Sequence, residues 1–120
     1  MVIDTNIIIA CLKGEEVASV LAQWKSSERA LFVSSITVAE TLALPKLRER
    51  EILKILGFFG NFVSIPFGDD IAESAAFLRR KYGLEIPDAG IAATALIHNF
   101  PLATRDTQFL RVKEIKVVNI

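Results

Sequence analysis

The sequence predicts an α/β fold: a three-layer sandwich in which helices cover both faces of a five-stranded parallel sheet. The first observation is a set of short apolar segments, most of them bounded by turn residues, which are typical of buried strands. These segments are residues 2–3, 31–33, 62–65, 102–103 and 117–118. The second observation is that helical patterns separate them, and strands that alternate with helices form parallel sheets covered on both faces.

The helices are predicted from apolar residues at helical spacing. They cover residues 16–25, 36–44, 47–59, 70–82 and 88–99. Pro45 closes or kinks the second of these helices, and Gly83 stops the fourth. Asp70 and Glu73 have the form of a capping box at the start of the fourth helix. The small residues at 89–95 predict that the last helix packs closely against the sheet.

The connections between the strands predict their order in the sheet. Two helices lie between the second and third strands, and two more lie between the third and fourth. Right-handed crossovers then permit the order 3-2-1-4-5, in which strands 1 and 4 flank the point where the winding reverses. Ligands of such sheets bind at that point, beyond the carboxyl ends of the strands.

Size and composition favour one compact domain that spans residues 1–120. The chain is 52% hydrophobic and 23% charged, and no apolar run approaches the roughly 20 residues that a bilayer crossing needs. No basic leader precedes Val2, so we expect a cytoplasmic protein without a membrane segment. The 14 basic and 14 acidic residues cancel, so a polyanionic partner would have to be attracted by a local patch or by bound metal ions.

Four acidic residues stand where apolar segments give way to polar turns: Asp4, Glu40, Asp88 and Asp106. Because the carboxyl ends of parallel strands meet at one edge of a sheet, we expect these side chains to converge there. Each also has a simpler interpretation. The three aspartates are suitable helix caps, and the glutamate could be a solvated surface residue. Asp69 and Asp70 follow the third strand at the far edge of the sheet, and we interpret them as helix caps.

Clustered carboxylates repel one another unless a cation neutralises them. Oxygen-only ligands select hard cations, so a shared pocket of these acids predicts Mg²⁺ or Mn²⁺. A zinc site is not expected, because Cys11 and His98 are lone residues without a partner motif. We expect Cys11 to be buried and inert, and His98 to be a capping or surface residue.

Four segments together resemble the PIN-domain nucleases, and within them the VapC-type toxins of prokaryotic toxin–antitoxin pairs. The segments are VIDTN at 2–6, SITVAE at 35–40, PDAGIAATA at 87–95 and TRDTQF at 104–109. The family's acidic quartet matches Asp4, Glu40, Asp88 and Asp106. The chain departs from the pattern at Gln108, where relatives often carry an aspartate, so that either Asp106 supplies the fourth carboxylate or one carboxylate is missing.

The resemblance implies metal-dependent cleavage of RNA by a toxin. It implies that Asp4, Asp88 and Asp106 hold the principal Mg²⁺ or Mn²⁺ ion and that Glu40 ligates a second ion or positions water. Supporting hydrogen bonds are expected from Thr5, Asn6 and Thr104, and phosphate contacts from Lys46, Arg48 and Arg105. By analogy with the family, we also expect a homodimer and an antitoxin peptide in an apolar groove near Leu44 and Leu47.

Two other classes of protein remain open from the sequence. One is a PIN-like interaction module that does not cut RNA, against which the intact acidic quartet argues. The other is an aspartate-based phosphohydrolase or receiver-like domain. That chemistry needs a nucleophilic aspartate with a lysine or a second close aspartate, whereas Asn6 stands two residues after Asp4 and no lysine follows a late strand at the predicted edge.

Overall fold

A computed structural model describes residues 1–27 and 29–120. The elements are, in chain order, β1 (Val2–Ile3), α1 (Thr5–Leu12), α2 (Val17–Ser26), β2 (Phe32–Ser34), α3 (Ser35–Leu42), α4 (Glu49–Phe59), β3 (Val63–Ile65), α5 (Asp69–Tyr82), α6 (Ile86–His98), β4 (Leu102–Thr104), the 3₁₀ helix η1 (Thr107–Arg111) and β5 (Val117–Asn119). The strands form one sheet in the order β3-β2-β1-β4-β5, and every pair is parallel. The predicted fold class and strand order are confirmed.

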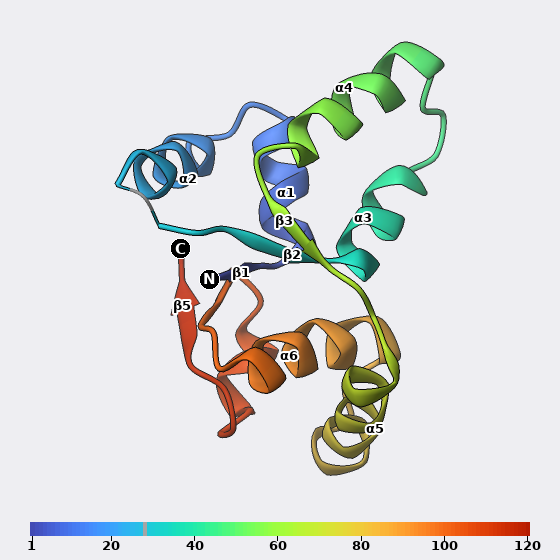
Figure 1. Cartoon of the computed structure of the whole chain (residues 1–120), viewed down its shortest axis with the longest axis vertical. Helices are drawn as coiled ribbons and strands as arrows, with labels where there is room; N and C mark the ends of the chain where they lie inside the picture. The colour runs from blue at the N-terminus through green and yellow to red at the C-terminus, as the bar shows by residue number, and fades with distance from the viewer. Residues whose placement is uncertain (28) are drawn as a thin grey trace.

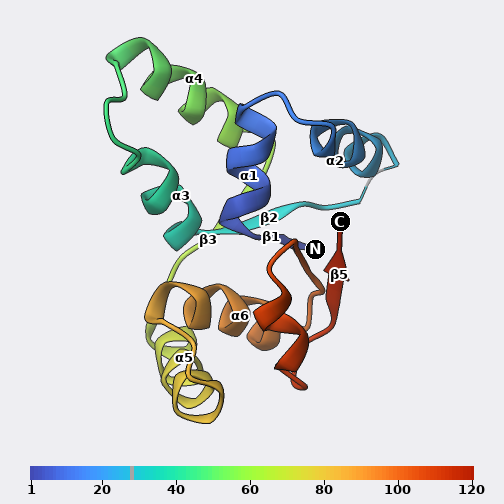
Figure 2. The same ribbon diagram turned by 180° about the vertical axis from the view of Figure 1, so that it is seen from behind.

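The sheet separates two layers of helices (Figure 1). Helices α1 to α4 lie on one side, and α5, α6 and η1 lie on the other, as the view from behind also shows (Figure 2). The side chains of β1 alternate between the two layers: Val2 packs in the cluster that contains α5 and α6, and Ile3 packs in the cluster that contains α1 and α2. Both side chains are fully buried, so the central strand is covered on both faces.

Helix α6 approaches its neighbours closely because its middle is built of small residues. A Cβ atom added at Gly90 would lie 2.3 Å from Ile36 Cδ1 and 3.0 Å from the ring of Phe67. The run from Ala89 to Ala95 is buried throughout. The expected tight packing of this helix is therefore present, and it fixes the first turn of α6, which carries Asp88.

Several predicted helix ends were wrong. Helix α5 begins at Asp69, with Gly68 as the N-cap and no side-chain capping bond, so Asp70 and Glu73 do not form a capping box. Asp70 instead accepts a hydrogen bond from the backbone NH of the next residue, Ile71. Helix α6 begins at Ile86, because Pro87 fits the first turn of a helix without needing an NH partner.

Two further boundaries differ from the prediction. The helix after Pro45 begins at Glu49, so Leu47 precedes it. Helix α3 begins one residue before the predicted start, where the Ser34 side chain accepts a hydrogen bond from Ile36 NH. This cap places the end of β2 directly against the first turn of α3, and Glu40 follows on the same helix.

Candidate active site

Asp4 is the N-cap of α1 and stands at the carboxyl end of the central strand β1. Asp4 is 3% exposed, and both oxygens of its carboxylate accept hydrogen bonds. Thr5 NH donates to Oδ1 at 2.8 Å, and Thr104 Oγ1 donates to Oδ2 at 2.7 Å. The capping interpretation is therefore right for Asp4, and it leaves the carboxylate fixed at the switch point between β1 and β4.

Thr5 connects this carboxylate to Glu40. Its hydroxyl donates to Glu40 Oε1 at 2.7 Å and lies 2.9 Å from Thr37 Oγ1. Glu40 is half-buried on α3. The alternative of a solvated surface glutamate is wrong, because Glu40 faces the same edge of the sheet as Asp4.

Thr104, at the end of β4, extends the network toward the other two acids. Its Oγ1 accepts a hydrogen bond from Asp106 NH at 2.9 Å while donating to Asp4. Asp106 caps η1 by accepting from Gln108 NH at 3.0 Å. Gln108 Nε2 then donates to Asp106 Oδ2 at 2.6 Å and to Asp88 Oδ2 at 3.2 Å.

One network of hydrogen bonds therefore links all four acids. Its members, in order, are Glu40, Thr5, Asp4, Thr104, Asp106, Gln108 and Asp88. Asp88 lies in the first turn of α6 and does not cap it, since Glu85 is the N-cap. The helix-cap alternative is thus wrong for Asp88. The sequence missed Gln108 as a member, although its place two residues after Asp106 in the TRDTQF segment was a usable signal.

Two carboxylates of this network, Asp4 and Asp88, have a raised pKa, and burial is the largest cause for both. Burial raises the pKa of Asp4 to about 6; the hydrogen bonds from Thr104 and Thr5 oppose the rise, and the charges of Asp88 and Asp106 add to it. Burial also raises the pKa of Asp88, with the charge of Asp106 acting in the same direction and the hydrogen bond from Gln108 opposing it. Excess negative charge of this kind is what a bound divalent cation would offset.

The donor atoms fit Mg²⁺ or Mn²⁺ in their chemistry, because the carboxylates and threonine hydroxyls are hard oxygen ligands. Among residues 1–27 and 29–120, however, no three His, Cys, Asp or Glu side chains are arranged ready to hold a metal ion. In the network, the Gln108 side chain stands between Asp88 and Asp106 and donates to one oxygen of each.

The chain is similar to known ribonucleases and toxins. The family model described as PIN domain matches residues 1–115. A VapC ribonuclease from Sinorhizobium fredii is 34% identical over 99% of this chain and 96% of its own length. Ribonuclease VapC19 from Mycobacterium tuberculosis is 32% identical over 88% of each chain.

The chain belongs to the PIN-domain family. A solved toxin–antitoxin complex from Klebsiella pneumoniae contains a chain 33% identical to it, with a TM-score of 0.83 over 98% of this chain and 94% of that one. The expected resemblance to VapC-type ribonuclease toxins is thereby confirmed. The PIN-domain match also covers all the segments that contribute to the acidic network.

Four residues expected at the PIN-domain site lie outside the network. Asn6 is exposed, and no hydrogen bond joins it to the acids within the described chain. Arg105 pairs instead with Glu15, at 2.9 Å between Nη1 and Oε2, and its Nε donates to the carbonyl of Ile120. Lys46 and Arg48 are exposed between α3 and α4. Their contact with phosphate stays a prediction.

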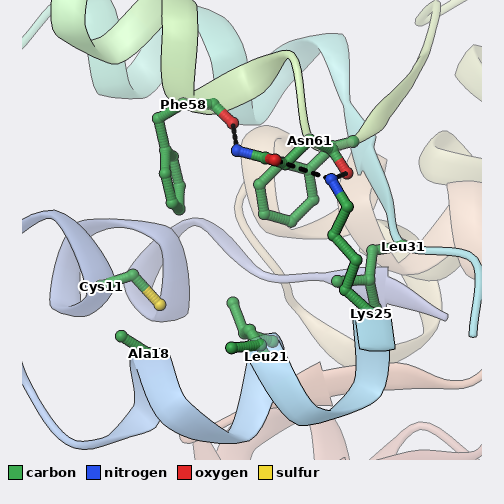
Figure 3. Close-up of a pocket in the computed structure, with 9 residues that line it drawn as sticks. Cys11, Ala18, Leu21, Lys25, Leu31, Phe58 and Asn61 are labelled. Atoms are coloured by element: carbon green, nitrogen blue, oxygen red, sulfur yellow. Dashed lines mark hydrogen bonds between the residues drawn. The ribbon is translucent and has the colours of Figure 1, made fainter. Parts of the chain in front are cut away.

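A separate apolar pocket of about 200 Å³ lies between α1, α2 and the end of α4 (Figure 3). It is lined by Cys11, Ala18, Leu21, Ala22, Lys25, Leu31, Phe58, Asn61 and Phe62. Lys25 Nζ donates to Asn61 Oδ1 at 2.7 Å at its edge. No carboxylate lines it, so its chemistry suits an apolar side chain rather than a metal ion. Leu44 and Leu47, expected to line a groove, are not part of it.

Cys11 is buried and His98 is exposed at the end of α6, as expected. Cys11 is buried, and its burial raises the pKa of the thiol. His98 lies in the last turn of α6, with Nδ1 3.1 Å from the carbonyl oxygen of Thr94 and its ring stacked on Phe100. Neither residue belongs to the acidic network. Within the described residues, no helix has both the length and the apolar character needed to span a bilayer.

Proposed function

We propose that this chain is the ribonuclease toxin of a toxin–antitoxin pair and that it hydrolyses RNA phosphodiester bonds with a bound Mg²⁺ or Mn²⁺ ion. The network that joins Asp4, Glu40, Asp88 and Asp106 is the observation that carries the proposal. An interaction module without catalysis would gain nothing from holding one buried and three half-buried carboxylates together, because their mutual repulsion opposes folding. The similarity to VapC ribonucleases supports the same conclusion.

In this proposal Asp4, Asp88 and Asp106 hold the ion. When bound, the ion supplies Lewis acidity that offsets charge building up on the phosphate oxygens. Thr104 and the Thr5 backbone keep the Asp4 carboxylate in one orientation. Asn6, which is exposed on α1, is assigned a hydrogen bond to the substrate.

We assign to Glu40 the role of orienting the attacking water. Thr5 engages Oε1, and the described residues donate no hydrogen bond to Oε2, so this oxygen is free to accept from a water molecule. The alternative role of Glu40 is to bind a second ion through the same oxygen. The proposal requires no protein nucleophile, since water attacks the phosphodiester directly.

The proposed activity is tested by incubating EDTA-stripped protein with RNA. We expect cleavage on addition of MgCl₂ or MnCl₂ and none in EDTA alone. Cleavage at the same rate in EDTA would contradict the role of the ion. Intact RNA in every condition, with folded protein, would contradict the ribonuclease.

RNA binding is expected to depend on the basic residues between α3 and the first turns of α4. Arg48 lines a hollow of about 240 Å³ together with Arg50, Glu51 and Lys54. The double variant Lys46→Gln and Arg48→Gln should bind RNA about tenfold more weakly, with a smaller salt dependence, because each phosphate contact releases a counterion. Fluorescence anisotropy in EDTA measures the affinity for RNA. If the double variant and the unmodified protein bind RNA equally well, RNA does not contact these two residues.

A control with the same change in charge is Arg80→Gln with Lys116→Gln, since both residues are exposed and lie outside the α3–α4 connection. If this control weakens RNA binding as much as the first double variant, the effect is general electrostatics rather than contact at the α3–α4 connection.

The antitoxin is the expected protein partner, since the similar chain from Klebsiella pneumoniae was solved in a toxin–antitoxin complex. We assign an apolar side chain of this partner to the pocket of Figure 3. The candidate antitoxin is a small protein encoded beside this chain, and it should co-purify with the chain and suppress RNA cleavage. A homodimer and a cytoplasmic location stay predictions, which light scattering and cell fractionation check.

The pocket assignment predicts the effect of one pair of variants. Ala22→Arg should place a charge in the pocket and release the co-expressed antitoxin, because a guanidinium group is costly to bury in an apolar cavity. Ser19→Arg is the matched control, since Ser19 is exposed on the same helix and does not line the pocket. Equal retention of the antitoxin by both variants in a pull-down would contradict the assignment.

A further inference from the structure

The Gln108 side chain binds the carboxylates of both Asp88 and Asp106, as a cation between them would. Its Nε2 lies 2.6 Å from Asp106 Oδ2 and 3.2 Å from Asp88 Oδ2. A side-chain amide has two N–H donors, so one group satisfies an oxygen on each acid. The reverse orientation would place the amide oxygen against two carboxylates. The orientation therefore follows from the charges around it.

The backbone of Gln108 is anchored, whereas its side chain is partly exposed to solvent. The next residue, Phe109, is fully buried and anchors η1 in the core, and Gln108 NH is held by the Asp106 cap. The side chain itself is half-buried at the edge of the site. It can therefore leave the carboxylates without unfolding η1.

The Gln108 amide lies where an ion held by Asp88 and Asp106 would have to bind. The amide and the ion cannot occupy this position at the same time. This conflict matches the observation that no three acidic side chains of the described chain are arranged as a ready metal site. We propose that Gln108 is a positioning residue that takes the place of the cation in the ion-free protein and competes with Mg²⁺ or Mn²⁺ for Asp88 and Asp106. This inference rests on the proposed metal-dependent function and adds a residue that sets ion affinity.

Competition predicts that removing the amide strengthens ion binding. Gln108→Met keeps the length of the side chain and removes both donors, so the ion no longer has to displace two charge-assisted hydrogen bonds. We expect the Kd for Mn²⁺ to fall by about tenfold, since each such bond contributes more than a neutral one. Isothermal titration of EDTA-stripped protein with MnCl₂ measures this without RNA.

Gln23→Met is the matched control. Gln23 is the only other glutamine in the chain and is exposed on α2, which contributes nothing to the acidic network. Its Mn²⁺ affinity should equal that of the unmodified protein. Gln108→Ala serves as a second variant if Gln108→Met fails to fold.

Thermal unfolding separates competition from a purely structural role. In EDTA, Gln108→Met should unfold at a lower temperature than the unmodified protein, because Asp88 and Asp106 then repel each other without a shared donor. In saturating Mn²⁺ this difference should shrink or reverse. A structural role alone would lower both melting temperatures equally, and that result would overturn the inference.

The remaining outcomes are also decisive. Weaker Mn²⁺ binding by Gln108→Met would show that the glutamine is a ligand, and equal binding would show that it does not compete; either result overturns the inference and leaves the proposed function intact. If neither the unmodified protein nor the variant binds Mn²⁺, the proposed metal site fails together with the inference. Binding by the variant that exceeds that of the unmodified protein supports both.

Discussion

Replacing Asp4 with asparagine is expected to abolish RNA cleavage while leaving the fold intact. Asp4 stands at the switch point of the sheet, and the asparagine amide is nearly the same size but carries no charge for the ion. Loss of one group that stabilises charge at a reacting phosphate lowers the rate on the order of 10³-fold. The measurement is the initial rate of RNA cleavage in MgCl₂, with far-UV circular dichroism to check the fold.

Asp69→Asn is the control for this experiment. Asp69 is an exposed aspartate in the first turn of α5, next to the edge strand β3, and it takes no part in the acidic network. Its variant should cleave RNA at the rate of the unmodified protein. If Asp4→Asn also retains that rate, the acidic network is not the catalytic site.

The second large effect concerns stability without an ion. In EDTA, the free energy of unfolding should decrease as the pH rises from about 4 to about 6. The pKa of Asp4 is about 6 in the folded chain, whereas the ordinary value for an aspartate, which applies to the unfolded chain, is 3.8. The unfolded chain therefore loses the Asp4 proton first, so the stabilisation is complete below pH ~4 and is lost as the pH rises.

The expected loss is up to about 3 kcal/mol, from the difference between these two pKa values. Asp88 adds to it in the same direction, because its pKa is also raised. Urea denaturation at a series of pH values measures the effect. Asp4→Asn should flatten the pH profile and be more stable than the unmodified protein at pH 7, whereas an unchanged profile would show that Asp4 is not the titrating group.

Addition of Mn²⁺ should reverse this loss at pH 7. An ion that binds the ionised carboxylates stabilises the folded state alone, in proportion to the logarithm of its concentration above the Kd. The carboxylates of the network would therefore destabilise the fold without the ion and stabilise it with the ion bound. Urea midpoints that do not move with Mn²⁺ would contradict this linkage.

Apolar patterning was enough to predict the sheet. Val2 and Ile3 are buried on opposite faces of β1, and such short apolar runs have few other stable places in a chain of this size. The helix starts were less accessible. At α5 two adjacent aspartates offered a capping signal, but the helix begins one residue earlier, after the extended backbone of Gly68. Which of several neighbouring residues caps a helix cannot be predicted from the spacing of its apolar residues.

The candidate site was only partly accessible from sequence. The convergence of Asp4 and Asp106 follows from the strand order, because their strands are neighbours. The bridge made by Gln108 does not, since it depends on the turn of η1 that carries the amide back to Asp88. The pairing of Arg105 with Glu15 was equally hidden, because nothing local in the sequence connects residues so far apart.

The most direct test of the central claim is anomalous diffraction from crystals of this protein grown or soaked with MnCl₂. The claim is that Asp4, Asp88 and Asp106 together bind a divalent cation at the carboxyl edge of the sheet. It predicts an anomalous peak within ligand distance of all three carboxylates, with the Gln108 amide turned away. Crystals saturated with Mn²⁺ that show no peak at this edge, or a peak that these aspartates do not touch, would contradict it.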